Sequence, residues 1–306
     1  MRGLKSVLLL LCFSLQHGSA TAVPLPVDEI APGVFVHQGV HEEFGDHYHG
    51  DIANIGFVIG DAAVAVIDSG GSYRVGAALR EAIRARTDKP IRYVINTHVH
   101  SDHIFGNAAF EPDGPEFIGH AQLPRAMRLR TETYEANLKT MLGQAAEGSR
   151  VVLPTLTIAT ERVIDLGNRR LLLKAWAIAH TDHDLTVMDE RTASWWLGDL
   201  LFVDRTPSID GDVAGWLSVI DTLSATPAAR AIPGHGPVVT DKNALLAKQR
   251  RYLQTLMQDL RQSIADDLPM QEAIAAAARS ERSQWQLFDA TNRRNATVLY
   301  PKLEWE

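Results

Sequence analysis

The stretch Thr97-His98-Val99-His100-Ser101-Asp102-His103 decides how this chain is expected to fold and where its chemistry lies. The apolar run before it predicts a strand over residues 92–96, so the stretch forms the loop at the carboxyl end of a strand, where α/β proteins place their ligands. Its alternating histidines, followed by aspartate and histidine as the chain turns into a helix, can point side chains to two sides of one point. This spacing indicates two metal ions rather than one. The alternative interpretation is a solvated polar loop.

Three further candidate ligands each follow or flank the end of a predicted strand. They are His180 in Ala-His-Thr-Asp-His-Asp-Leu, Asp199 in Trp-Leu-Gly-Asp-Leu-Leu-Phe and His235 in Ile-Pro-Gly-His-Gly-Pro. Taken singly, each is explained at least as well as a loop, cap or turn residue. Their joint occurrence after the first cluster is what supports a metal site.

The composition restricts the chemistry of such a site. The chain of 306 residues has twelve histidines and a single cysteine, Cys12, so it forms no internal disulfide and no thiolate zinc cluster. Any metal is therefore expected on imidazole and carboxylate groups. With 45% hydrophobic and 22% charged residues, the sequence is that of a globular protein and not of a disordered chain or a membrane bundle.

Residues 1–22 have the pattern of a secretory signal peptide: a basic start, a short apolar run and a small-residue site. We expect cleavage after Ala22, with Ala20 as the second choice, and a periplasmic or secreted protein. A lipid anchor on Cys12 is the alternative, although Leu11 stands where a small residue is expected. Loss of Arg2 and Lys5 takes the formal charge from −7 to −9, which disfavours nucleic acid as a partner. No later segment is apolar enough to span a membrane.

Strand and helix patterns alternate along the rest of the chain, which predicts an α/β protein. Strands are predicted over 54–59, 64–68, 92–96, 117–118, 163–166, 171–176, 185–188, 194–197 and 231–232, and helices over 73–86, 122–142, 215–223, 243–267 and 270–278. Residues 143–160 read as a connection between two halves. We expect one domain over 23–306, in which 241–306 form a helical C-terminal portion. The oligomeric state stays open.

The seven candidate ligands resemble those of the metallo-β-lactamase superfamily, whose His-x-His-x-Asp-His motif is matched by residues 98–103. The resemblance implies an αββα sandwich of two facing sheets with helices outside and the metals at one edge. It implies a first metal on His98, His100 and His180, and a second on Asp102, His103 and His235, with Asp199 bridging them. Two Zn²⁺ ions are expected, and iron or manganese would also suit nitrogen and oxygen ligands.

Within that superfamily, residues 51–57, 179–185 and 294–304 resemble the exported quinoprotein relay system zinc metallohydrolases. The resemblance implies an association with a periplasmic, pyrroloquinoline-quinone-dependent oxidation system. The expected activity is attack by a metal-bridging hydroxide on an ester, lactam or thioester bond of a small-molecule substrate. Asp102 is expected to orient the hydroxide or carry a proton to the leaving group.

Four other residues are candidates near the metals. Asp68 ends a predicted strand and is expected to hold the metal loop by hydrogen bonding. His47 and His49 repeat the His-x-His spacing and would contact substrate, or else be exposed loop residues. His183 would contact a ligand or the substrate, or else lie on a surface loop.

Three other functions stay open. One is a β-lactamase, which Asp199 disfavours because the usual dizinc lactamase sites lack a bridging aspartate there. A thioester hydrolase or an iron-dependent sulfur dioxygenase of the same superfamily is another. The last is a metal-binding accessory protein without enzymatic activity. The sequence leaves the substrate itself undetermined.

Overall fold

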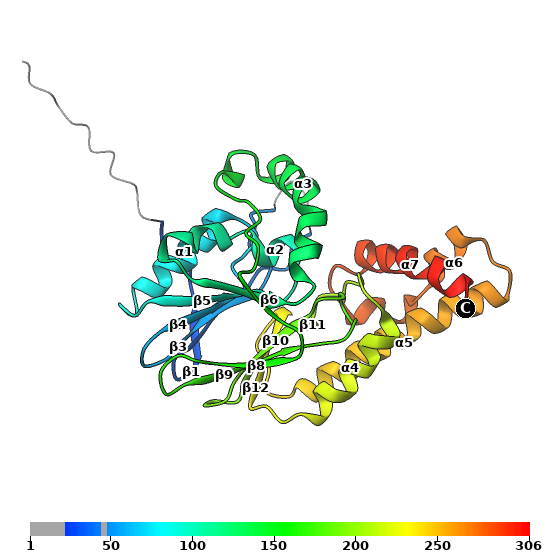
Figure 1. The fold of residues 1–306 in the computed structure, drawn as a ribbon. Coiled ribbons are helices and arrows are strands. Elements are labelled where there is room, and N and C mark those ends of the chain that lie inside the picture. The colour runs from blue at the N-terminus through cyan, green and yellow to red at the C-terminus, as the bar shows by residue number, and fades with distance from the viewer. Residues whose placement is uncertain (1–21, 44–47) are drawn as a thin grey trace, which may run out of the picture.

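Two β-sheets face each other and helices cover both outer faces, as Figure 1 shows for the computed structural model, which describes residues 22–43 and 48–306. This is the αββα sandwich that the sequence predicts. The predicted signal peptide lies outside the described residues apart from Ala22, and so does His47. In the described ranges, no helix has the length and apolar content needed to cross a bilayer.

The first sheet has seven strands in the order of the chain. Its pairs are antiparallel from β1 to β4 and parallel from β4 to β7. The strands span Asp28–Ala31 (β1), Val34–His37 (β2), Ile55–Ile59 (β3), Val64–Ile67 (β4), Ile91–Ile95 (β5), Glu116–His120 (β6) and Leu156–Ile158 (β7).

The second sheet has five strands in the order β12-β11-β10-β9-β8. Only the pair of β11 and β12 is parallel. The strands span Glu161–Asp165 (β8), Arg170–Ala175 (β9), Leu185–Asp189 (β10), Ser194–Phe202 (β11) and Arg230–His235 (β12).

The helices divide between the two outer faces. On the first sheet lie Tyr73–Arg84 (α1), Ser101–Ile104 (α2) and Leu123–Leu142 (α3), with the 3₁₀ turns Asn107–Asp113 (η1) and Gly143–Ala146 (η2). On the side of the second sheet lie Val213–Ala225 (α4), Lys242–Ala265 (α5), Met270–Ala276 (α6) and Phe288–Glu304 (α7), with the 3₁₀ turn Arg279–Gln284 (η3).

Hydrophobic periodicity explains how these layers hold together. In α1, Val75, Leu79 and Ile83 recur every fourth residue and are buried on the first sheet, while Ser72 caps the helix by accepting a hydrogen bond from the Val75 N–H. Along β11, the adjacent tryptophans point to opposite faces. Trp196 packs between the sheets, and Trp195 packs on the helical side.

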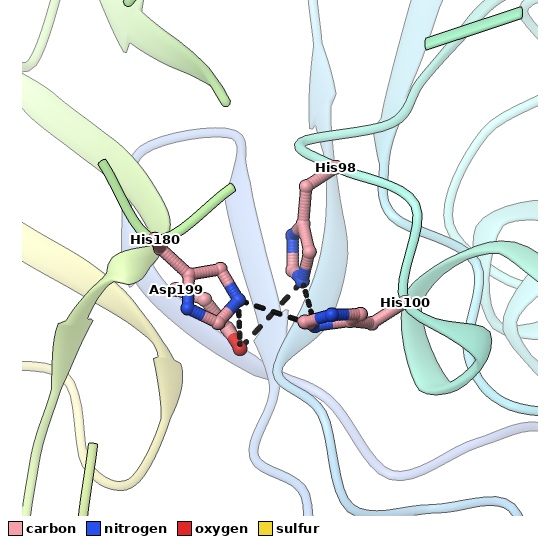
Figure 2. Close-up of side chains that lie close together, drawn as sticks. All are labelled: His98, His100, His180 and Asp199. Carbon is pink, nitrogen blue, oxygen red and sulfur yellow. Dashed lines mark hydrogen bonds and ion pairs between the residues drawn. The ribbon is translucent and has the colours of Figure 1, made fainter. Parts of the chain in front are cut away.

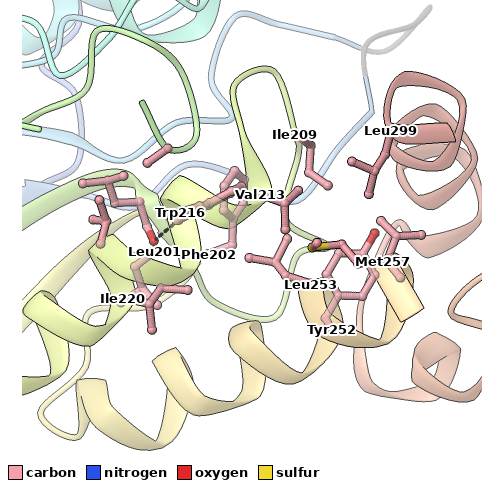
Figure 3. Packing of buried hydrophobic residues seen from close by; sticks show 14 of the residues in the cluster. Leu201, Phe202, Ile209, Val213, Trp216, Ile220, Tyr252, Leu253, Met257 and Leu299 are labelled. Atoms are coloured by element: carbon pink, nitrogen blue, oxygen red, sulfur yellow. Dashed lines mark hydrogen bonds between the residues drawn. The ribbon is translucent and has the colours of Figure 1, made fainter. Parts of the chain in front are cut away.

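The core on the helical side of the second sheet joins the C-terminal helices to the rest of the fold. Figure 3 shows Trp216 of α4 among side chains of β11, α5 and α7, with its indole N–H donating to the Leu200 carbonyl at 3.1 Å. Tyr252 and Leu253 of α5 and Leu299 of α7 belong to the same core. Helices α5 and α7 therefore share buried packing with the sheet that carries part of the candidate site.

The structure changes several predicted boundaries. Strand β11 continues to Phe202 instead of ending at residue 197, so Asp199 lies inside a strand and not beside its end. The strand bends there, because Gly198 has φ +53° and the register with β12 shifts around it. The predicted 143–160 connection contains β7, and the sequence patterns missed β1, β2 and α7.

Candidate metal centre

All seven predicted ligands come together in two adjacent groups. The first group is His98, His100, His180 and Asp199, drawn in Figure 2, and the second is Asp102, His103 and His235. Within each group the potential ligand atoms lie within 4.8 Å of one another. The two groups have the membership that the resemblance implies for two metal ions.

Different elements bring these side chains to one place. Residues 98–103 occupy the loop after β5 and the start of α2, at the carboxyl end of a strand in the parallel part of the first sheet. His180 lies between β9 and β10, Asp199 inside β11 and His235 at the end of β12. The main chain of β12 runs so close to β11 here that a Cβ at Gly234 would overlap Asp199 Oδ1.

Asp199 lies between the groups and offers one carboxylate oxygen to each. Its Oδ2 is 3.6 Å from His98 Nε2 and 3.3 Å from His180 Nε2. Its Oδ1 is 3.3 Å from His103 Nε2 and 3.5 Å from His235 Nε2. The carboxylate is therefore placed to touch two cations at once.

Each of the five imidazoles turns one ring nitrogen toward the site and holds the other on an oxygen. His180 Nδ1 contacts the Ser208 carbonyl at 2.8 Å, and His235 Nδ1 contacts the Ile52 carbonyl at 2.7 Å. Because a carbonyl oxygen only accepts, these nitrogens carry the proton, and the inward Nε2 atoms carry lone pairs. Both rings are thereby set as neutral ligands.

The same reasoning assigns the other three rings. His103 Nδ1 donates to Asp68 Oδ2 at 2.8 Å, and His100 Nε2 donates to Asp210 Oδ2 at 3.1 Å. Thr97 Oγ1 donates its proton to Asp68 Oδ2, which leaves it to accept from His98 Nδ1 at 3.0 Å. All five imidazoles thus present a lone pair inward.

Inward lone pairs leave polar atoms that the protein itself does not satisfy. His98 Nε2 and His180 Nε2 lie 3.0 and 3.1 Å from His100 Nδ1, so three acceptor nitrogens converge without a proton among them. His103 Nε2 and Asp199 Oδ1 are buried without a hydrogen-bond partner. Such groups are costly unless a cation lies among them, so the residues fit bound metal ions.

The electrostatics of the site agree with this fit. Burial lowers the pKa of His180 to about 3, although Asp199 opposes the shift. Burial would raise the pKa of Asp199, but His235 and His103 outweigh it and keep that pKa well below its usual value. Burial would lower the pKa of His103, but the nearby carboxylates outweigh burial and raise that pKa well above its usual value. Among the described residues, no lysine or arginine pairs with Asp102 or Asp199, so the site favours added positive charge.

A cavity of about 710 Å³ opens onto both groups, which is the size of a small-molecule site. Its lining includes His100, Asp102, Asp199 and His235 from the two groups. The remaining walls mix polar and apolar side chains: Glu43, Ser101, Arg130, Tyr134, Asn137, Thr140, Met141, Phe202, Arg205, Ser208, Asp210, Ala290, Thr291 and Arg294. A substrate in this cavity would touch ligands of both groups.

The other predicted residues have different positions. Asp68 accepts hydrogen bonds from His103 and from the Thr97 N–H and hydroxyl, as the prediction of a supporting role requires. His183 is fully buried and contacts Asp182, so its interpretation as a surface residue is wrong, and it does not belong to either group. His49 is exposed and does not line the cavity.

Sequence patterns missed the supporting residues of the second half. Asp210 holds His100 and also accepts from Arg130 Nη2 at 3.2 Å. Its segment is clamped by α7, because Asn295 donates to the Pro207 carbonyl at 2.6 Å and accepts from the Ile209 N–H at 3.0 Å. No spacing rule marks such residues, since each contact joins segments that are distant in the sequence.

Comparison with known proteins agrees with the architecture. A family model described as the metallo-beta-lactamase superfamily matches residues 49–235. A metallo-beta-lactamase from Pontibacter korlensis is 20% identical, with a TM-score of 0.60 over 75% of this chain and 99% of that one. The metallo-beta-lactamase FIM-1 from Pseudomonas aeruginosa, in its mono-zinc form, is 21% identical, with a TM-score of 0.57 over 76% of this chain and 97% of that one.

No curated protein matches the sequence. At these identities the solved structures establish the fold alone. The family match, in contrast, covers more than half of the chain and includes every residue of the two ligand groups. This chain belongs to the metallo-beta-lactamase superfamily.

Proposed function

We propose that this protein is an exported hydrolase that uses two divalent metal ions, zinc in the first place, to cleave an ester, lactam or thioester bond of a small molecule. The observation that carries the proposal is the convergence of four imidazoles on the two oxygens of Asp199, with the fifth imidazole, His100, beside His98 and His180. His98, His100 and His180 would hold one ion, and Asp102, His103 and His235 the other, with Asp199 between them.

Five nitrogen and two carboxylate donors suit zinc, and also iron or manganese. Two such ions, when bound, would lower the pKa of a water molecule from 15.7 toward about 7 and polarise the bond to be cleaved. A reaction with water as the nucleophile needs no cysteine, which agrees with a chain whose only cysteine is Cys12 in the predicted signal peptide.

Asp102 is the chain's own candidate for proton transfer. Its carboxylate is buried and lines the cavity, so it faces both the ligand group and the substrate. Burial would raise its pKa, but His103 and His235 outweigh that effect, so the carboxyl group is ionised at neutral pH. It can then accept a proton from the attacking water at a carboxylate oxygen and release it to the leaving group.

Metal analysis combined with a hydrolysis panel tests the proposal. The mature protein should contain two zinc ions per chain and hydrolyse at least one class among aryl esters, thioesters and the lactam nitrocefin. Replacing Asp199 by alanine should remove at least one ion and lower the activity by roughly a thousandfold, because both groups lose a shared ligand. Asp221→Ala, which removes a carboxylate that is 73% exposed on α4, serves as the matched control.

Other results would point elsewhere. One iron per chain would indicate a sulfur dioxygenase, and tight metal binding without any turnover would indicate an accessory protein. Preferential nitrocefin turnover would keep the hydrolase and narrow it to a β-lactamase. Export and association with a quinoprotein oxidation system are parts of the proposal that rest on the sequence resemblance and on the predicted signal peptide.

A further inference from the structure

Three arginines from separate parts of the chain surround the cavity over the two ligand groups. Arg130 comes from α3, Arg205 from the segment after β11 and Arg294 from α7. They are concentrated there although the whole chain has a formal charge of −7. The same lining holds four carboxylates, so the attraction for an anion depends on which of these charges are already paired.

The three arginines differ in whether they form an ion pair with a carboxylate. Arg130 Nη2 is paired with Asp210 Oδ2 at 3.2 Å. Arg205 Nη1 instead donates to the Glu42 carbonyl at 2.9 Å, and Arg294 Nη1 donates to the Ser208 hydroxyl. Neither of these two forms an ion pair with any residue that the structure describes.

Carboxylates that also line the cavity do not cancel these charges. Asp102 and Asp199 belong to the ligand groups, and Asp210 is shared between His100 and Arg130. The remaining acid, Glu43, is exposed and makes no ion pair with a described residue. The guanidinium groups of Arg205 and Arg294 therefore line the cavity with N–H donors that can bind a ligand.

Apolar and aromatic side chains form another part of the wall of the same cavity. They are Tyr134, Met141, Phe202 and Ala290. Burial raises the pKa of Tyr134 to about 12, so its hydroxyl is neutral and can donate a hydrogen bond. The lining suits a ligand with an apolar body and a charged end.

We propose that Arg205 and Arg294 form an anion subsite for a carboxylate or phosphate group that the substrate carries away from its cleaved bond. The planar guanidinium fork matches either group. Arg294 lies on α7, beyond the end of the family match at residue 235, so this part of the subsite comes from a helix outside the matched region. The substrate class rests on the proposed function, whereas the anion subsite itself does not require hydrolysis.

Calorimetric titration of the zinc-loaded mature protein tests the subsite with three probes that share one body: 4-phenylbutanoate, 4-phenylbutyl phosphate and the neutral 4-phenylbutanamide. At least one anion should bind about tenfold more tightly than the amide, and the tighter anion identifies the preferred group. Arg205→Gln and Arg294→Gln should each weaken that anion about tenfold and leave the amide unchanged. Arg294→Lys should restore part of the loss, because it restores the charge.

Arg293→Gln is the matched control, since Arg293 is exposed on the same helix and does not line the cavity. Equal binding of the three probes, or anion binding that neither arginine variant weakens, would overturn the subsite. The hydrolysis panel separates the two proposals. Arginine-dependent anion binding without turnover would refute the hydrolase and keep the subsite, whereas turnover without arginine dependence would do the reverse.

Discussion

The two halves of the sandwich contribute to the metal centre in different ways. The first half supplies four candidate ligands from six consecutive residues, 98–103, whereas the second half supplies three from three separate segments. The outward nitrogens of His98, His100 and His103 are held by side chains, and those of His180 and His235 by main-chain carbonyls. The histidines of the contiguous motif are therefore oriented by neighbouring side chains, whereas the two histidines from separate segments are oriented by main-chain carbonyl groups.

The halves also hold each other in place. Asp210 of the second half holds His100 of the first, and the Ile52 carbonyl of the first half holds His235 of the second. Asn54, just before β3, donates to the Pro233 and Gly236 carbonyls that flank His235. The site lies where the halves meet, and neither half completes it alone.

The largest effect is expected from breaking the contact between the halves with Asn54→Ala. The Asn54 amide donates at 2.9 and 2.7 Å to two main-chain carbonyls and accepts from the Gly39 N–H at 3.1 Å, all in the buried interior. Leaving these groups unpaired should lower the free energy of unfolding by about 3 kcal/mol. Calorimetry should show the melting temperature falling by roughly 6–12 °C. Asn243→Ala, at an exposed position on α5, should change it little, and an equal drop in both variants would contradict the bracing role.

A smaller effect is expected from the side-chain support of the first half. Asp68→Asn keeps the shape and tolerates the left-handed backbone at this position, φ 51°. It replaces one acceptor oxygen by an NH2 group, so either the Thr97 N–H or the pair of His103 and the Thr97 hydroxyl loses its acceptor. Metal affinity at the group of His103 should fall by roughly 10- to 100-fold. Competition with a chromophoric chelator measures the two affinities separately.

Asp210→Asn is the contrasting variant, because Asp210 holds His100 of the other group. It should weaken the group of His100 and spare that of His103. If Asp210→Asn weakened the group of His103 as much as that of His100, the assignment of Asp210 to the group of His100 would be wrong.

The smallest effect is expected at a histidine of the first half that lies outside the ligand groups. His37 has both ring nitrogens on oxygens, at 2.7 Å from the Pro26 carbonyl and 2.7 Å from Asp51 Oδ1. Burial would lower its pKa, but the hydrogen bond to Asp51, the charge of Asp51 and the hydrogen bond to the Pro26 carbonyl together outweigh burial and raise that pKa. Such a group stabilises the fold below its unfolded pKa of 6.5, and the contribution disappears as the pH rises through the folded value.

Urea unfolding of His37→Gln and the parent protein at pH 5.5 and 8.5 measures this contribution. The variant should be less stable by under about 1 kcal/mol at the lower pH, and the difference should shrink at the higher pH. The titration of all other groups is common to both proteins and cancels. A difference that is the same at both values would show that His37 is not protonated in the fold.

Strand and helix periodicities were sufficient for an α/β protein, because they are local properties. The αββα layers and the two candidate ligand groups came from the resemblance that the short motifs carry. The sequence was insufficient where a residue acts across the fold. Asp199 was placed beside a strand end, since the bend at Gly198 that continues β11 depends on its neighbour β12. His183 was open to a surface interpretation, and only packing shows that it is buried.

By itself, the sequence predicted a nitrogen and oxygen metal site after β5, and it supplied the three later residues that the fold brings to the same place. Only the tertiary structure decided which nitrogen of each imidazole faces inward, because that depends on oxygens such as those of Ile52, Ser208 and Asp210. It also placed Arg205 and Arg294 on one cavity. The two segments meet because Asn295 of α7 donates a hydrogen bond to the carbonyl of Pro207, which is 88 residues away in the sequence. Periodicity records which side of an element is buried, whereas contacts between distant segments exist only once the chain has folded.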